Sequence, residues 1–242
     1  DEALTEEEQA TIDRAFPRLR LSAFTGTLVR DTRDDALDAT RGYFMSAEGT
    51  LAARALGGQV GFVKSYLQAQ GYRRLPLGDR VVLAGRIAVG LADGFPREVT
   101  DLDPNGNPTT EFPEELPASE RFFAGGDTTM RGFRLDSVGA PNTITVNGFP
   151  IGGNGLVLLN GELRVPVWKD VGAAFFVDAG NVFERVTQID LGELRGSIGL
   201  GLRYRSPAGP LRFDLGFKLD RRVIGGELED RHGFHFSFGQ AF

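Results

Sequence analysis

The sequence contains no cysteine, and its 242 residues include only two histidines, two methionines and one tryptophan. Without cysteine, a disulfide scaffold or a zinc–thiolate site is excluded. The 33 acidic residues outnumber the 27 basic ones, so the basic excess typical of nucleic-acid-binding proteins is missing. No apolar run approaches the roughly 18 to 20 residues of a membrane-spanning helix. A β-barrel membrane protein remains compatible with these absences, because its strands are only about 10 residues of alternating polarity.

Glycine is abundant by contrast, with 33 residues, about twice its usual share of roughly 7%. Residues 1–19 form an acidic segment in which the spacing of apolar residues is helical, and Thr5 with Glu8 fits a capping box. After Pro17 the hydrophobic period changes from about 3.6 to 2 and stays there to the end of the sequence. We therefore predict a helical segment in residues 1–19 and an all-β domain in residues 20–242.

Nine strands are predicted, and most are roughly 10 to 17 residues long, against roughly 5 to 6 in soluble sheets. They cover residues 20–33, 42–56, 58–74, 79–95, 154–167, 169–183, 194–207, 210–221 and 232–242. Strands of this length fit an antiparallel sheet that crosses a bilayer at a tilt. Short turns connect them on one side, whereas residues 96–153 form a very long connection without a periodic pattern.

Large apolar residues alternate with small or charged ones, most clearly in the last three strands. Leu211, Phe213 and Leu215, for example, alternate with Arg212 and Asp214. A soluble β-sandwich that binds a lipid and a membrane barrel both fit this alternation. Nearly all of the 19 phenylalanines lie in such strands or at their ends, opposite charged positions, and this favours a barrel whose charged face lines a lumen.

Residues suited to catalysis or metal binding have plainer explanations. Asp31 and Arg33 share a face of a strand, so a lumenal ion pair is favoured over acid–base chemistry. His232 and His235 are three residues apart in a strand and therefore lie on opposite faces. No G-x-S-x-G elbow is present. We expect no enzyme activity, no catalytic residue, no cofactor and no metal site.

The long connection holds one arginine between glycine-rich segments, Arg131. Glu162 and Asp178 fall on the polar faces of two successive strands and should point into the lumen. We predict that residues 96–153 fold back into the barrel and that Arg131 binds both carboxylates. The alternative is that Arg131 lies exposed at a loop tip without a partner. In either case, we expect Gly125, Gly126 and Gly132 to serve the backbone conformation rather than any chemistry.

The residues of this connection also carry a family resemblance. Residues 121–133 read RFFAGGDTTMRGF, which is similar to the signature of the loop before the twelfth strand in the bacterial surface-antigen barrels, the BamA- and TamA-type outer-membrane assembly factors. Matches in the family's order follow in residues 159–164, 176–183, 199–214 and 239–242, and residues 30–43 resemble its RDTRD hairpin. The loop residues that carry the resemblance are Arg121, Phe122, Phe123, Gly125, Gly126, Arg131, Gly132 and Phe133.

The resemblance implies a sixteen-stranded barrel, of which the nine strands correspond to the eighth through the sixteenth. An open sheet in a membrane would leave two unpaired edges. Three resolutions are open: the chain is part of a longer protein, it closes on itself as a barrel of about eight strands, or it pairs with another chain. In a small closed barrel the lumen is nearly filled, so part of residues 96–118 would lie outside.

The implied function is the assisted folding and insertion of outer-membrane proteins through a lateral seam, in a Gram-negative-type outer membrane. Residues 232–242 would form the gate edge, and Phe238, Gly239 and Phe242 resemble the terminal aromatic signal, from which Gln240 departs. The implied partners are the lipid bilayer, outer-membrane protein precursors or exported polypeptides, and periplasmic assembly partners. A polypeptide secretion translocator and a passive structural barrel or pore are the alternatives.

Overall fold

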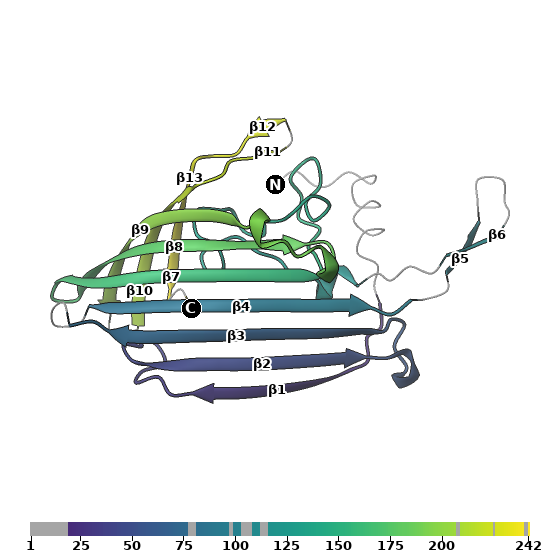
Figure 1. The fold of residues 1–242 in the computed structure, drawn as a ribbon, viewed down its shortest axis with the longest axis horizontal. Helices are drawn as coiled ribbons and strands as arrows, with labels where there is room; N and C mark the ends of the chain where they lie inside the picture. The colour runs from purple at the N-terminus through teal and green to yellow at the C-terminus, as the bar shows by residue number, and fades with distance from the viewer. Residues whose placement is uncertain are drawn as a thin grey trace.

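The computed structural model describes residues 19–76, 81–96, 99–102, 108–111, 116–206, 209–224, 226–239 and 242. The helix predicted in residues 1–19 therefore lies, except for its last residue, outside the described residues. The described residues form a nine-stranded antiparallel sheet in the order β1-β2-β3-β4-β7-β8-β9-β10-β13 (Figure 1). Its strands are β1 (Ala23–Asp31), β2 (Gly42–Ala52), β3 (Phe62–Arg74), β4 (Val82–Gly94), β7 (Gly155–Trp168), β8 (Val171–Phe183), β9 (Arg195–Ser206), β10 (Gly209–Lys218) and β13 (His232–Phe238). The predicted nine strands are confirmed.

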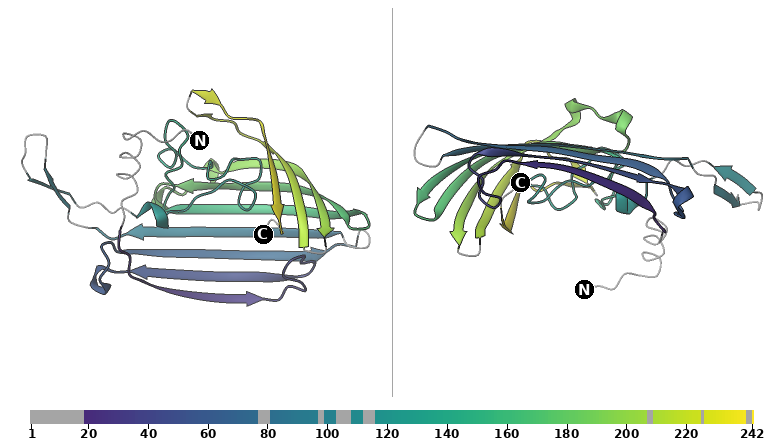
Figure 2. Two further views of the ribbon diagram at one scale, coloured as in Figure 1. Left: turned by 180° about the vertical axis from the view of Figure 1, so that it is seen from behind. Right: turned by 90° about the horizontal axis from the view of Figure 1, so that it is seen from below.

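The sheet is an arch whose concave side holds the later part of the long connection, residues 116–153, and the C-terminal residue (Figure 2). Its convex face is apolar and uncovered over much of its area, because the large residues of each strand point outward, as the alternation predicts. Leu200 is 53% exposed and Phe236 58% exposed on this face. In the described part of the chain no second sheet packs over it, so the sandwich alternative is wrong.

The two edges of the sheet are β1 and β13, which do not pair with each other in the described residues. All nine residues of β1 are exposed. Closure of the barrel therefore stays a prediction. Among the helices that the structure describes, none has the length and apolar character needed to cross a membrane.

The connections at the two ends of the sheet differ in length. Residues 169–170 make a tight turn at one end, called here the short-turn end, whereas residues 95–154 connect β4 to β7 at the other, the long-loop end. This long connection is not wholly irregular, since β5 (Val99–Leu102) and β6 (Pro108–Glu111) form a hairpin that extends past the sheet (Figure 1). The hairpin escaped the prediction because its strands have four residues each and no apolar alternation.

Smaller elements complete the loops. The connection between β10 and β13 contains the two-residue strands β11 (Val223–Ile224) and β12 (Glu227–Leu228). The 3-10 turns are η1 (Arg54–Leu56), η2 (Ala118–Glu120), η3 (Val186–Gln188) and η4 (Leu191–Glu193).

Candidate functional site

The segment from residue 116 to residue 153 enters the concave side as a closed loop, called here the lumenal loop. Isolated bridges join Phe122 to Gly153 and Ala124 to Val138 across its base. The Phe122 ring stacks on Tyr66 of β3 with ring centroids 6.3 Å apart, and it fills the space where a side chain at Gly90 of β4 would lie. These contacts fasten the loop to the inner face of β3 and β4.

The other motif residues shape the loop. The Arg121 Nε donates to the carbonyl oxygen of Leu116 at 3.0 Å. The Phe123 ring packs against Gly152, and a Cβ on Gly152 would lie 2.7 Å from that ring. Gly125 has a φ of +120°, and a Cβ there would lie 2.3 Å from the Arg134 carbonyl oxygen. A tight turn with positive φ at this point therefore requires glycine.

Arg131 lies at the inner end of the loop and contacts both predicted carboxylates. Its Nε and Nη2 donate to the two Asp178 oxygens at 2.8 Å each, and its backbone N–H donates to Asp178 Oδ2 at 3.0 Å. Its Nη1 donates to Glu162 Oε2. The guanidinium stacks on the Phe176 ring, 3.7 Å from the ring centroid. Arg131 is 1% exposed, so the alternative of a free loop tip does not describe this structure.

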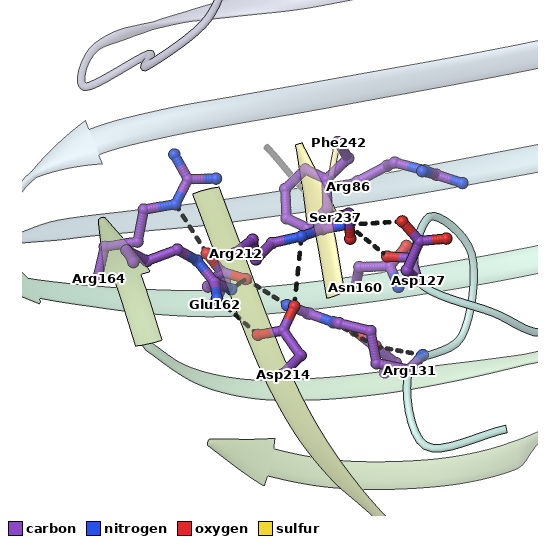
Figure 3. Close-up of polar contacts among 12 residues, drawn as sticks. Arg86, Asp127, Arg131, Asn160, Glu162, Arg164, Arg212, Asp214, Ser237 and Phe242 are labelled. Atoms are coloured by element: carbon purple, nitrogen blue, oxygen red, sulfur yellow. Dashed lines mark hydrogen bonds and ion pairs between the residues drawn. The ribbon is translucent and has the colours of Figure 1, made fainter. Parts of the chain in front are cut away.

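The ion pairs continue across the inner face toward the edge strand (Figure 3). Glu162 also accepts from Arg164 at 2.8 Å and from Arg203 at 3.0 Å. Arg203 bonds Asp214 at 2.6 Å. Because Glu162 meets three guanidinium groups, the lumenal charge is shared through a network rather than confined to isolated pairs.

The network ends on Arg212 of β10, beside the edge strand; its Nη2 lies 3.0 Å from Asp127 Oδ2 of the loop and 2.8 Å from Ser237 Oγ of β13. The alternation placed Arg203, Arg212 and Asp214 on the polar face. It gave no sign that they join the ion pairs of Arg131, because that depends on the register between strands.

Phe133 is fully buried between cations at the long-loop end. The Arg195 guanidinium lies 4.6 Å from its ring centroid and the Lys218 Nζ 5.2 Å. Both cations also pair with Glu229, in the connection that leads into β13. Burial raises the pKa of Glu229, but hydrogen bonds from Arg195 and from the backbone of Arg222 outweigh it, so the pKa lies below its ordinary 4.5. Phe133 belongs to the sequence motif, but no pattern in the sequence indicated the cluster of charges around it.

The C-terminal end differs from its prediction. The last strand was expected to run through residue 242, but it ends at Phe238, because Gly239 adopts a φ of +99°. Phe242 then packs inside the arch against Tyr72 of β3, whose hydroxyl donates to the Phe242 carbonyl oxygen at 2.8 Å. Phe238 points outward and is 60% exposed. Residues 240 and 241 lie outside the described residues.

Residues weighed for acid–base chemistry or metal binding lie as follows. Arg33 and Asp31 form an ion pair at 2.7 Å. His232 contacts the outward Phe217 ring, whereas His235 faces the lumenal loop. Within the part of the chain that the structure describes, no group of three or more potential ligands is arranged for a metal ion.

Comparison with known proteins identifies the family. Residues 4–242 match the model of the Omp85 superfamily domain. The chain belongs to the Omp85 superfamily. It is 31% identical to the outer membrane protein assembly factor BamA of Nitratidesulfovibrio vulgaris over 88% of this chain, which is 24% of that protein. It is 26% identical to a SAM50-like protein of Schizosaccharomyces pombe over 94% of this chain and 47% of that protein.

A solved structure has the same fold. The crystal structure of BamA from Haemophilus ducreyi lacking POTRA domains 1–3 superposes with a TM-score of 0.67 at 23% identity, covering 90% of this chain and 42% of that chain. This Omp85 chain thus spans about a quarter of the length of the BamA relative and about half that of the SAM50-like protein.

Proposed function

We propose that this Omp85 chain is part of an outer-membrane β-barrel that assists the folding and insertion of outer-membrane proteins through a seam at β13. Its BamA relative is an outer membrane protein assembly factor, and this similarity supports the proposed activity. The uncovered apolar convex face would contact the acyl chains of the bilayer. We further propose that the protein is located in the outer membrane of a Gram-negative-type envelope and that it is not an enzyme.

The form of the edge strand carries the proposal. β13 has 7 residues, whereas β1, the next shortest strand of the sheet, has 9 and β7 has 14. A short strand makes few ladder hydrogen bonds, and Gly239 turns the chain inward where further bonds would form. Separating β13 from its neighbour therefore breaks fewer backbone hydrogen bonds than separating two of the longer strands.

The driving force would come from the substrate. An incoming precursor strand that pairs with the free side of the seam satisfies backbone groups that cost several kcal/mol each when unpaired in hydrocarbon. This is β-augmentation carried out inside a bilayer. Because each hydrogen bond formed drives the next step, neither a nucleotide nor a cofactor is required.

The test is reconstitution of the full-length protein in liposomes with an unfolded outer-membrane protein as substrate. Acceleration of precursor folding, relative to empty liposomes and to liposomes holding an unrelated barrel, would support the proposal. No acceleration would remove it. Leakage of a small solute without acceleration would instead indicate a passive barrel or pore, and transfer of an exported polypeptide into the vesicle would indicate a secretion translocator.

A further inference from the structure

Three glycines lie side by side on the inner face where the lumenal loop meets the last strands. Gly199 of β9 pairs with Gly216 of β10, and Gly216 pairs with Gly233 of β13. None of the three has a side chain that could rise from the sheet, so their row forms a flat floor across the final three strands.

The tip of the lumenal loop rests on two of these glycines, Gly216 and Gly233, whereas the Phe176 ring lies over Gly199. A Cβ on Gly216 would lie 2.6 Å from the Gly132 backbone nitrogen, and a Cβ on Gly233 would lie 2.6 Å from the Gly132 carbonyl oxygen. Gly132 itself has a φ of +89°, and a Cβ on it would come within 2.9 Å of Gly216. Backbone therefore packs directly on backbone. A side chain at Gly216 or Gly233 would push the loop tip away from β10 or β13, respectively.

The same contact includes a hydrogen bond to the edge strand. The Gly132 backbone N–H donates to His235 Nε2 of β13 at 2.9 Å. Since Nε2 accepts, the imidazole proton of this neutral ring lies on Nδ1. The neighbouring Arg131 carbonyl accepts from Ser197 Oγ of β9 at 2.5 Å. One peptide of the loop thus spans from β9 to β13.

Arg131 and Gly132, although adjacent, hold different parts of the wall. Arg131 pairs with carboxylates of β7 and β8. Gly132, by contrast, packs on Gly216 of β10 and Gly233 of β13 and donates its hydrogen bond to His235 of β13. The loop tip consequently connects β7 and β8, in the middle of the sheet, to its last two strands, β10 and β13.

We propose that His235 is a positioning residue of the seam: together with the glycine floor, it lets the lumenal loop hold β13 in place against β10. The inference rests on the proposed function only in assigning the β13 edge to the seam. If a precursor strand displaces β13, the Gly132–His235 hydrogen bond must break on the lumenal side, together with the Arg212–Ser237 hydrogen bond.

Hydrogen exchange of the full-length protein in liposomes tests this assignment. His235→Ala removes the acceptor, and loss of one neutral hydrogen bond should speed exchange of the amides in residues 232–239 about fivefold. His235→Gln should restore slow exchange, because its amide oxygen can accept from the Gly132 N–H. His232→Ala is the matched control, since His232 lies on the same strand but on the outer face.

A second pair of variants probes the floor itself. Gly233→Ala should speed exchange both in residues 232–239 and in the loop tip, because the added methyl group occupies the place of the Gly132 carbonyl. Gly49→Ala, at a strand position of β2 with nothing within 4 Å of the new Cβ, should leave both unchanged. This comparison separates lost contact from the general effect of adding a methyl group to a strand.

The proposal is overturned if His235→Ala exchanges like the wild type in residues 232–239, or if exchange rises equally in β7 and β8, which would mean global destabilisation. Confinement of the change to β13 and the loop tip, with rescue by His235→Gln, would support it. Exchange does not depend on assembly activity, so a protein that fails to accelerate precursor folding would refute the proposed function and leave this result to be judged alone.

Discussion

The ion pair between Arg131 and Asp178 can be tested by a double-mutant cycle. The side chains of Arg131 and Asp178 are 2% and 0% exposed, so in the folded protein each charge depends on its protein partners rather than on bulk water. Within the described residues, the Asp178 carboxylate accepts three hydrogen bonds, and all three come from residue 131, one of them from its backbone. Arg131→Ala therefore leaves a buried carboxylate with a single backbone donor.

The expected cost follows from this difference in partners. Removing one member of a buried, hydrogen-bonded ion pair costs about 3 to 5 kcal/mol. Arg131→Ala should lie at the upper end, because it also leaves the hub carboxylate of Glu162 with one cation fewer. Asp178→Ala should cost less, since Arg131 keeps its bond to Glu162. The double variant should cost about 2 to 3 kcal/mol less than the sum of the two single variants.

Urea unfolding in detergent, followed by the heat-modifiable gel mobility of the folded barrel, measures the four free energies of the cycle. Protease sensitivity of the lumenal loop gives a second, local readout. A double variant whose loss equals the sum of the single losses within about 0.5 kcal/mol would refute the ion pair as a coupled unit. Wild-type stability in Arg131→Ala would refute the anchoring role of the loop altogether.

The remaining predictions concern the ends of the sheet and its inner floor. Because the pKa of Glu229 is lowered in the folded protein, its contribution to stability is complete above pH 4.5 and is lost as the pH falls through the folded pKa. The protection factors of the amides in residues 219–231, which are corrected for the intrinsic pH dependence of exchange, should therefore fall in acid, and in Glu229→Gln they should be low already at pH 7. Gly199→Ala places a methyl group 2.2 Å from a buried aromatic ring and should cost about 1 to 3 kcal/mol in urea unfolding, whereas Gly71→Ala, which meets nothing within 4 Å, should cost far less. The pair of Asp38 and Arg205 is 29% and 52% exposed, so Asp38→Asn should change stability by no more than about 1 kcal/mol, and a larger loss would contradict the screening argument.

The sequence predicted the strands well because strand faces follow parity alone. The predicted strand at residues 42–56 begins where β2 begins and overruns its end at Ala52, since the following residues enter the turn η1 without breaking the apolar pattern. The same parity placed Glu162 and Asp178 on the inner face. Because a loop arginine at that depth must find acceptors, their contact with Arg131 could be inferred before any coordinates.

The edge contacts could not be inferred in this way. Only two residues separate β9 from β10 in the sequence, and so short a connection fixes their register, including the pairing of Gly199 with Gly216. The connection between β10 and β13 contains its own hairpin, and its length leaves the register of Gly233 undetermined. Parity places His235 inward but cannot tell which of the many loop residues it meets, 103 positions earlier in the chain.

The two contacts of the loop tip differ in strength, and this difference predicts an order of release. On the side of β8, Arg131 makes charge-assisted bidentate bonds with a fully buried carboxylate, and such bonds are roughly twice as strong as neutral ones. On the side of β13, the contact consists of one neutral hydrogen bond and glycine packing. When a precursor competes for the seam, β13 should therefore leave the loop while the loop stays fastened to β7 and β8. The lumenal loop would then support the wall throughout opening, because the strand that must move is the one it holds least tightly.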